Sequence, residues 1–241
     1  MFPIREQMKK NRKFVQMKNI VSVKTLKEHW EKAGREDSEA PLKVWYQEVK
    51  KSNWKSPNEV KQIYRSASII GDNRIAFNIC GNKYRLIVKI NYESQWVFIR
   101  FVGTHEEYDK IDAATIYLIT QKKTEMKIKL IKTEADYSAA LARIDELFDA
   151  TPGSKNFDEA ELLMKLVEFY EEQHYKIEAP DPIEAIKFRM EQMGMKRVDL
   201  EQYLGTRARV SEILNKQRNL SLAMIKKLHK EFGIPAESLL A

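Results

Sequence analysis

The sequence predicts an α+β domain in its first half and an all-α region in its second half. Two observations indicate this division. Three strand-like runs follow helical segments before residue 105, and helical periodicity dominates from residue 133 onward. With 241 residues, of which 43% are hydrophobic and 10% aromatic, the chain is long enough for one large or two small folded domains.

Composition excludes several kinds of protein. The single cysteine, Cys80, leaves no internal disulfide and fits a reducing compartment. No apolar stretch approaches the ~20 residues that cross a bilayer, so we expect a soluble, cytoplasmic protein with no membrane partner. The four histidines lie too far apart in the sequence to suggest a metal site, and we expect neither a metal nor a cofactor.

Charge is distributed unevenly along the chain. Residues 1–125 carry nine more basic than acidic side chains, residues 126–180 carry five more acidic ones, and residues 181–241 carry three more basic ones. Solvation of an ordinary surface explains any single block. Two basic regions around an acidic one fit better with two polyanion-binding domains and an internal or partner-facing neutraliser.

Apolar spacing predicts two helices between Thr25 and about Lys51, separated by a break at Ala40-Pro41. The residues expected to face inward are Leu26, Trp30 and Ala33 in the first helix and Leu42, Val44, Trp45 and Val49 in the second. A third short helix is expected to open at Ser56-Pro57, because proline is favoured in a first turn. Its inward residues are Val60 and Ile63-Tyr64.

A turn signal at Gly71-Asp72-Asn73 introduces three expected strands. The strands cover residues 74–79, 83–92 and 95–102, joined by turns at Cys80-Gly81-Asn82 and Glu93-Ser94. In the middle strand one face is apolar and the other carries Arg85 and Lys89. A helix over about residues 105–114 is expected to close this antiparallel unit.

Two amphipathic helices are expected after a basic connector over residues 116–132, whose distinctive residues are Lys122, Lys123, Met126, Lys127, Lys129 and Lys132. The apolar positions are Tyr137, Leu141, Ile144 and Phe148 in the first helix and Leu162, Leu163, Leu166, Val167 and Tyr170 in the second. The first helix is expected to end at Thr151-Pro152-Gly153. The second stripe is wide enough for a dimer interface or for docking on the N-terminal domain, besides packing of the pair. A hinge follows at residues 179–182.

Residues 200–222 predict two short helices joined by a tight turn, which is the pattern of a helix-turn-helix. Gly205 is expected to end the first helix in the left-handed conformation, and Thr206 is expected to cap the second. The candidate base-contacting residues are Thr206, Arg207, Ala208, Arg209, Ser211 and Glu212, and the candidate phosphate contacts are Lys216, Gln217, Arg218 and Asn219. Arginine suits guanine, because its planar fork reaches both acceptors of that base. A packing unit that binds no DNA is the alternative interpretation.

Residues 210–221, with the sequence VSEILNKQRNLS, resemble the Xre/Cro family of helix-turn-helix repressors. Ser221 then caps a further helix, which Gly233-Ile234-Pro235 ends as is usual in that family. The resemblance widens upstream, where the acidic helices, the Pro-Asp-Pro hinge and the run from Ile183 to Met195 resemble the HigA type of antitoxin. This similarity spans about residues 126–241 and implies operator binding as a dimeric repressor.

Polar residues gather around the three predicted strands: Asn78, Asn82, Lys83, Arg85, Arg100, Thr104, His105 and Tyr108. RNA cleavage without a metal needs a base for the 2′-hydroxyl, an acid for the leaving oxygen and cations for the phosphate. Histidine and tyrosine can exchange protons, and arginines can hold a phosphate by two hydrogen bonds. Structural or solvated roles for these side chains are the alternative.

The strings FNICGNKYRLIV (residues 77–88), FIR (98–100) and THEEYD (104–109) resemble the HigB toxin family of the RelE-like superfamily, over about residues 17–115. The resemblance implies a small helix-plus-antiparallel-sheet fold and cleavage of messenger RNA, commonly on the ribosome. It implies a catalytic set of Arg85, Arg100, His105 and Tyr108 first, with Asn78, Asn82 and Lys83 second. We assign Arg85 and Arg100 to the phosphate, and His105 or Tyr108 to proton transfer.

Together these features predict a toxin and its antitoxin in one chain. The expected parts are a basic lead-in (1–16), a HigB-like domain (17–115), a connector (116–132), an acidic helical region for dimerisation and neutralisation (133–179) and a helix-turn-helix domain (182–241). Fusion raises the effective concentration of each half for the other. The alternatives are a DNA-binding regulator with an inactive toxin domain, and a toxin domain that binds RNA or ribosomes without cutting.

Overall fold

The computed structural model describes residues 19–114, 116 and 129–241. The first half forms a five-stranded mixed sheet of order β1-β5-β4-β3-β2, which confirms the α+β class. The strands are β1 (Asn19–Val21), β2 (Ser68–Gly71), β3 (Arg74–Ile79), β4 (Tyr84–Asn91) and β5 (Trp96–Thr104). β1 runs parallel to β5, and the other neighbours are antiparallel.

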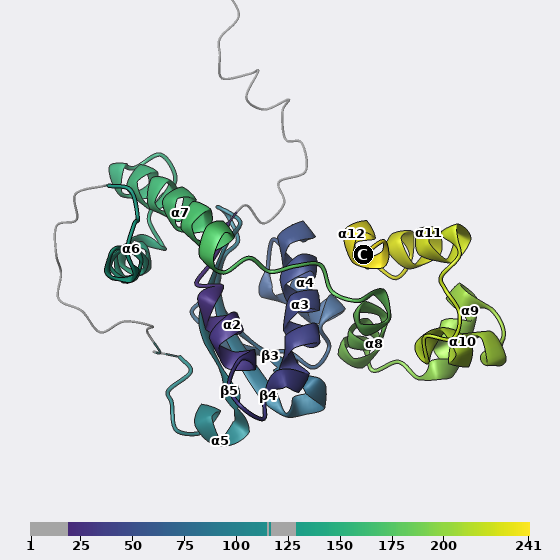
Figure 1. The fold of residues 1–241 in the computed structure, drawn as a ribbon. Coiled ribbons are helices and arrows are strands. Elements are labelled where there is room, and N and C mark those ends of the chain that lie inside the picture. Colours follow the sequence, from purple (N-terminus) through teal and green to yellow (C-terminus); the bar gives the residue numbers. More distant parts are fainter. Residues whose placement is uncertain (1–18, 115, 117–128) are drawn as a thin grey trace, which may run out of the picture.

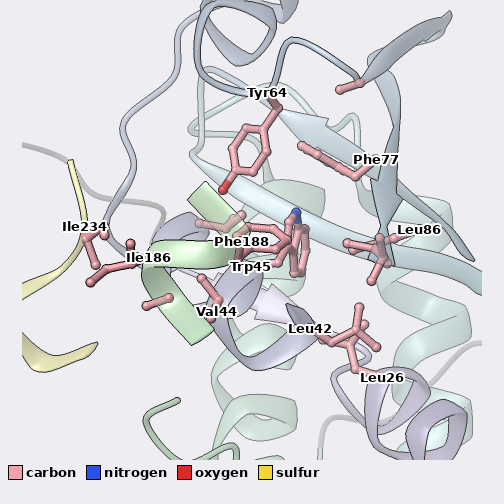
Figure 2. Packing of buried hydrophobic residues seen from close by; sticks show 14 of the residues in the cluster. Leu26, Leu42, Val44, Trp45, Tyr64, Phe77, Leu86, Ile186, Phe188 and Ile234 are labelled. Carbon is pink, nitrogen blue, oxygen red and sulfur yellow. The ribbon is translucent and has the colours of Figure 1, made fainter. Parts of the chain in front are cut away.

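One face of the sheet is covered by α2 (Lys24–Trp30), α3 (Glu39–Lys51) and α4 (Pro57–Ile63). The core on this side includes Trp45 and Tyr64 from the helices and Phe77 and Leu86 from the strands (Figure 2). Ser56 caps α4 as expected, with Pro57 in its first turn. The predicted alternation along β4 is confirmed, because Tyr84, Leu86, Val88 and Ile90 all join this core.

The opposite face is covered by a helical hairpin made of α6 (Glu134–Leu147) and α7 (Lys155–His174). Trp96 and Phe98 of β5 pack there, while the intervening Val97 belongs to the first core. Phe157 of α7 stacks on Trp96 with ring centroids 4.7 Å apart. The hairpin therefore docks on the sheet and does not merely pack on itself.

The remaining helices form a C-terminal unit next to α3: α8 (Pro182–Met193), α9 (Glu201–Leu204), α10 (Arg207–Leu214), α11 (Leu222–Lys230) and α12 (Ala236–Leu239). Figure 1 shows the sheet domain between the α6–α7 hairpin and these helices. Phe188 of α8 lies beside Tyr64, with ring centroids 6.3 Å apart (Figure 2). No helix of the described ranges is long and apolar enough to cross a membrane.

The predicted helix break at Ala40-Pro41 is wrong. α3 begins at Glu39, so Pro41 lies in the first turn, where its missing N–H costs no hydrogen bond. The chain instead turns near Gly34, which has φ of +80°. Ala33 consequently lies outside α2 and is exposed.

Two strands of the sheet, β1 and β2, were not predicted, and the predicted helix over 105–114 is too long. α5 covers only His105–Tyr108, because residues 109–114 lack an apolar stripe that could hold a longer helix on the sheet. The turn at Gly71-Asp72-Asn73 joins β2 to β3, with φ positive at all three residues. The expected lead-in (1–16), the start near Met17 and most of the connector, including Lys122, Lys123, Met126 and Lys127, lie outside the described residues.

Candidate functional site

Four of the predicted catalytic residues come together at one end of the sheet. Asn78 of β3 lies directly opposite Arg85 of β4, and Arg85 lies opposite Gly103 of β5. The next turn of chain is α5, which contributes His105 and Tyr108. The Arg85 guanidinium lies over the Tyr108 ring, 5.6 Å from its centroid. We call Asn78, Arg85, His105 and Tyr108 the open row.

Gly103 allows this row to form. A Cβ at this position would lie 2.4 Å from the Phe101 ring and 2.7 Å from the Glu107 carboxylate. Any side chain would therefore displace α5 or Phe101. Glycine at position 103 therefore leaves room for the Phe101 ring and the Glu107 carboxylate, so α5 can begin directly after β5 and place His105 near Arg85.

A capping box fixes α5 at the end of β5. The Thr104 hydroxyl accepts a hydrogen bond from the Glu107 amide, and the Glu107 carboxylate accepts one from the Thr104 amide, at 3.2 and 2.8 Å. Arg35 donates to the same carboxylate at 2.7 Å, and chiefly for this reason the pKa of Glu107 is lowered to about 2. Sequence reasoning missed Arg35 and Glu107 as positioning residues, although the T-x-x-E pattern was a signal for the cap.

Three polar atoms of the open row are buried without a hydrogen-bond partner in the described structure: Asn78 Oδ1, Arg85 Nε and His105 Nε2. Native proteins pair most buried polar atoms, so a cluster of unpaired ones on adjacent elements suggests a place where a substrate supplies the partners. The types present are an acceptor, a cation and an imidazole. They suit a phosphodiester with a nearby hydroxyl.

Arg100, the second predicted phosphate ligand, is not in the open row. It lies at a β-bulge of β5, is 2% exposed and forms an ion pair with Asp145 of α6. Its guanidinium packs over the Phe98 ring, 4.0 Å from the centroid. Burial lowers the pKa of Arg100, and the Asp145 carboxylate opposes that shift. A helix of the C-terminal half therefore covers this residue.

Lys83 and Asn82 also stand apart from the open row. The Lys83 ammonium pairs with Asp37 at 2.7 Å, and the Tyr84 hydroxyl donates to the same carboxylate at 2.8 Å. Asn82 is exposed in the turn after β3, with φ of +119°. Asp37, which precedes α3 and forms the ion pair with Lys83, was not indicated by any pattern in the sequence.

The second candidate site is the helix-turn-helix, where α10 follows α9 as expected and Thr206 caps it by accepting from the Arg209 amide at 3.4 Å. Arg207, Ala208 and Arg209 are exposed with Thr206, while Ser211 and Glu212 are partly buried. Gly205 has φ of +98°, but its ψ of −146° lies outside the left-handed helical region. The predicted left-handed ending is therefore wrong, and this conformation is one that essentially only glycine adopts.

The predicted phosphate contacts follow α10 as a group of exposed residues: Lys216, Gln217, Arg218 and Asn219. Two of them already have acidic partners. Lys216 pairs with Asp181 at 2.9 Å, and Arg218 pairs with Glu212 at 2.5 Å. Both cations are more than half exposed, so these pairs are weak and can exchange for phosphates.

α8 attaches the C-terminal unit to the sheet domain. Arg189 forms a buried ion pair with Glu48 of α3 at 2.9 Å, and the Tyr64 hydroxyl donates to Glu48 at 2.6 Å. Gln192 of α8 donates to the backbone carbonyl of Asn78 at 2.9 Å. Among the residues that the structure describes, no group of three or more His, Cys, Asp or Glu side chains is arranged to hold a metal ion.

Comparison with known proteins identifies both halves. The family model described as HigB_toxin, the RelE-like toxic component of a toxin-antitoxin system, matches residues 38–111, and a helix-turn-helix model matches residues 186–239. Similar curated proteins are the mRNA interferase toxin HigB of Escherichia coli (strain K12) and the mRNA interferase HigB of Escherichia coli O157:H7 and of Shigella flexneri. Each is 31% identical over 93 residues, which cover 38% of this chain and 88% of the relative.

Proposed function

Because the chain belongs, through its N-terminal half, to the HigB family of RelE-like toxins, we propose that it is a toxin-antitoxin pair in one polypeptide. The N-terminal half is an endonuclease that cleaves messenger RNA on the ribosome without a metal. The C-terminal half neutralises it and binds operator DNA as an autorepressor. The ion pair between Arg100 of the toxin domain and Asp145 of α6 is the observation that carries this proposal.

Cleavage at the open row would proceed without a metal. The 2′-oxygen of the RNA attacks the adjacent phosphorus while His105 or Tyr108 takes its proton, and the bond to the 5′-oxygen breaks as that oxygen gains a proton. The products are a 2′,3′-cyclic phosphate and a 5′-hydroxyl. Arg85 stabilises the charge that builds on the phosphate, and its unpaired Nε is available for that bond.

Neutralisation would follow from the position of the α6–α7 hairpin. The residues of the open row stay partly exposed, whereas the hairpin helps to bury Arg100 and Lys89, where the path of an RNA chain over the sheet would continue. The hairpin also carries its own anchors, since Phe148 packs against Phe98 with ring centroids 5.8 Å apart. RNA and hairpin therefore compete for one face of the sheet.

Operator binding would use the exposed face of α10, with Arg207 and Arg209 at its start. A two-fold operator needs a dimer. Two large apolar side chains on α7, Leu162 and Phe169, are 47% and 58% exposed, and they support a homodimer contact through the antitoxin half.

Expression of residues 17–118 in cells tests the proposal. We expect growth arrest, loss of the arrest with His105→Ala, and rescue when residues 126–241 are supplied as a second chain. Cyclic-phosphate ends on the cleaved RNA distinguish cutting from binding. Harmless growth with an abundant, folded fragment would contradict the nuclease, and the chain would then be a DNA-binding regulator.

A further inference from the structure

Three buried cations lie side by side on the sheet face next to the open row. Arg74 of β3 is directly opposite Lys89 of β4, and Arg100 lies at the bulge of the neighbouring β5. Their side chains are 1%, 8% and 1% exposed. We call these three residues the cation cluster.

The acids that face the cation cluster come mostly from the C-terminal half. Lys89 lies between Asp72 of the β2–β3 turn, at 3.0 Å, and Asp149, which follows α6, at 2.6 Å. Arg100 pairs with Asp145. Arg74 donates to the carbonyls of Ala113 and Ile116, at 3.2 and 3.3 Å, and lies 3.6 Å from Asp72. Two of the three carboxylates thus belong to one turn of the hairpin.

Burying three cations on one sheet face is costly, and well-packed apolar residues would serve stability as well or better. The curated relatives are matched over 88% of their length by the toxin half alone. A toxin domain without the hairpin would present the cluster to solvent as a strip of positive charge beside Arg85. Such a strip attracts a polyanion.

We propose that Arg74, Lys89 and Arg100 form a binding subsite for the RNA backbone, and that Asp145 and Asp149 occupy it in place of two phosphates. The two aspartates are one helical turn apart, so their carboxylates can reach neighbouring cations of the cluster. This subsite rests on the proposed nuclease function. It extends the substrate contact beyond the open row to the backbone of the same single strand.

Two details favour a phosphate ligand over a purely structural ion pair. Arg100 keeps two further buried nitrogens, Nε and Nη1, without a hydrogen-bond partner, although a phosphate could bind such a guanidinium with two oxygens. Phe148, between the two aspartates in sequence, also packs on Phe98 and lies near Trp96. A sheet without the hairpin would therefore expose these two rings of β5 beside the cations. An aromatic surface beside a row of cations is the usual composition of a single-strand binding groove.

The test measures binding of a single-stranded 2′-O-methyl RNA, which resists cleavage, to the full-length chain by fluorescence anisotropy at several salt concentrations. The double variant Asp145→Asn/Asp149→Asn should bind at least tenfold more tightly than the wild type. The matched control is Glu146→Gln/Glu159→Gln, because those acids pair with Arg143 away from the sheet and change the net charge equally. The control should stay within about twofold.

Lys89→Gln, added to the aspartate double variant, should weaken binding and reduce the slope of log affinity against log salt by about one. Lys43→Gln serves as its control, since Lys43 pairs with Glu39 on α3 at the other face. An unchanged slope with Lys89→Gln, or equal RNA binding by the wild type and the aspartate variant, would overturn the subsite. If the aspartate variant unfolds, Phe148→Ala opens the hairpin without changing charge, and Lys89→Gln in that background must give the same loss of slope.

Parallel incubation with ordinary RNA separates this subsite from the nuclease. Tight binding that depends on Lys89 but gives no cleavage would contradict the proposed activity and retain the subsite. Cleavage by the aspartate variant that ignores Lys89→Gln would retain the activity and overturn the subsite.

Discussion

The C-terminal half contacts the toxin domain on two sides, and the two contacts differ in chemistry. The α6–α7 hairpin covers the polar face of the sheet with aromatic rings and with aspartates that pair with Lys89 and Arg100. α8 instead packs on α3 and on Tyr64, which follows α4, around the buried Glu48–Arg189 pair. At the open row, α8 contacts the backbone, because Gln192 donates to the Asn78 carbonyl.

This difference indicates a division of labour. Of these two contacts, the hairpin is the one that buries Arg100, which was predicted to bind phosphate, so we propose that the hairpin controls RNA access. α8 is continuous with the helix-turn-helix unit and sets where the DNA-binding helix lies relative to the toxin. We therefore expect the two contacts to be separable by mutation.

Breaking the α8 contact should give the largest loss of stability. Arg189→Ala leaves the carboxylate of Glu48, which is 5% exposed, without its cation. Loss of one partner of a buried ion pair costs roughly 3–5 kcal/mol, measured as the free energy of unfolding in urea. RNA binding by the full chain should stay weak, because the hairpin remains in place. The double variant Glu48→Gln/Arg189→Met is the control and should lose less. A gain in RNA affinity from Arg189→Ala alone would break the division between the two contacts.

The hairpin contact should be sensitive to pH. Glu171 of α7 is fully buried and accepts hydrogen bonds from the Val23 amide at 2.8 Å and from the Tyr137 hydroxyl. Burial outweighs these bonds and raises the pKa of Glu171 to about 8. The folded state thus binds a proton that the unfolded state has released, so this group destabilises the fold increasingly as pH rises from about 4.5 towards 8.

Glu171→Gln removes that titration. Between pH 6 and 7.5 the unfolding free energy of the wild type should fall by about 2 kcal/mol relative to this variant, at up to 1.36 kcal/mol per pH unit. Urea unfolding at several pH values measures the difference. Glu172→Gln, at an exposed neighbouring position, should track the wild type. Parallel profiles for the wild type and Glu171→Gln would exclude Glu171 as the source.

Local pattern was sufficient to predict much of the fold. The alternation along β4, the Pro57 helix start and the caps at Thr206 and Ser221 depend on neighbours in the sequence, and the structure confirms them. β1 has three residues and exists because it pairs with β5, so no local pattern could reveal it.

The candidate site shows the same limit. The resemblance to HigB toxins singled out Asn78, Arg85 and His105, and their places at the ends of adjacent elements explain why the structure brings them together. Burial of Arg100 was not, because its partner Asp145 belongs to another region of the chain and an amphipathic pattern does not say which surface a helix docks on. The wide stripe on α7 was compatible with both docking and dimerisation. Part of it docks, while Leu162 stays exposed, as does Phe169, which lies outside the predicted stripe.

A substitution on the DNA-binding face should have the smallest effect on binding. It tests whether this face acts independently of the hairpin contact and the α8 contact. Arg207 is exposed in the first turn of α10, and no toxin residue pairs with its side chain among the described residues. Arg207→Ala should weaken binding to the chain's own promoter DNA by about 1–3 kcal/mol, or roughly 5- to 150-fold, in a mobility-shift or anisotropy titration. Lys187→Ala, on the exposed side of α8, is the matched loss of one charge away from α10. Because Arg207 is remote from the sheet face, RNA binding and the urea midpoint should not change. If Arg207→Ala and Lys187→Ala weakened DNA binding equally, general charge and not the recognition helix would determine the affinity.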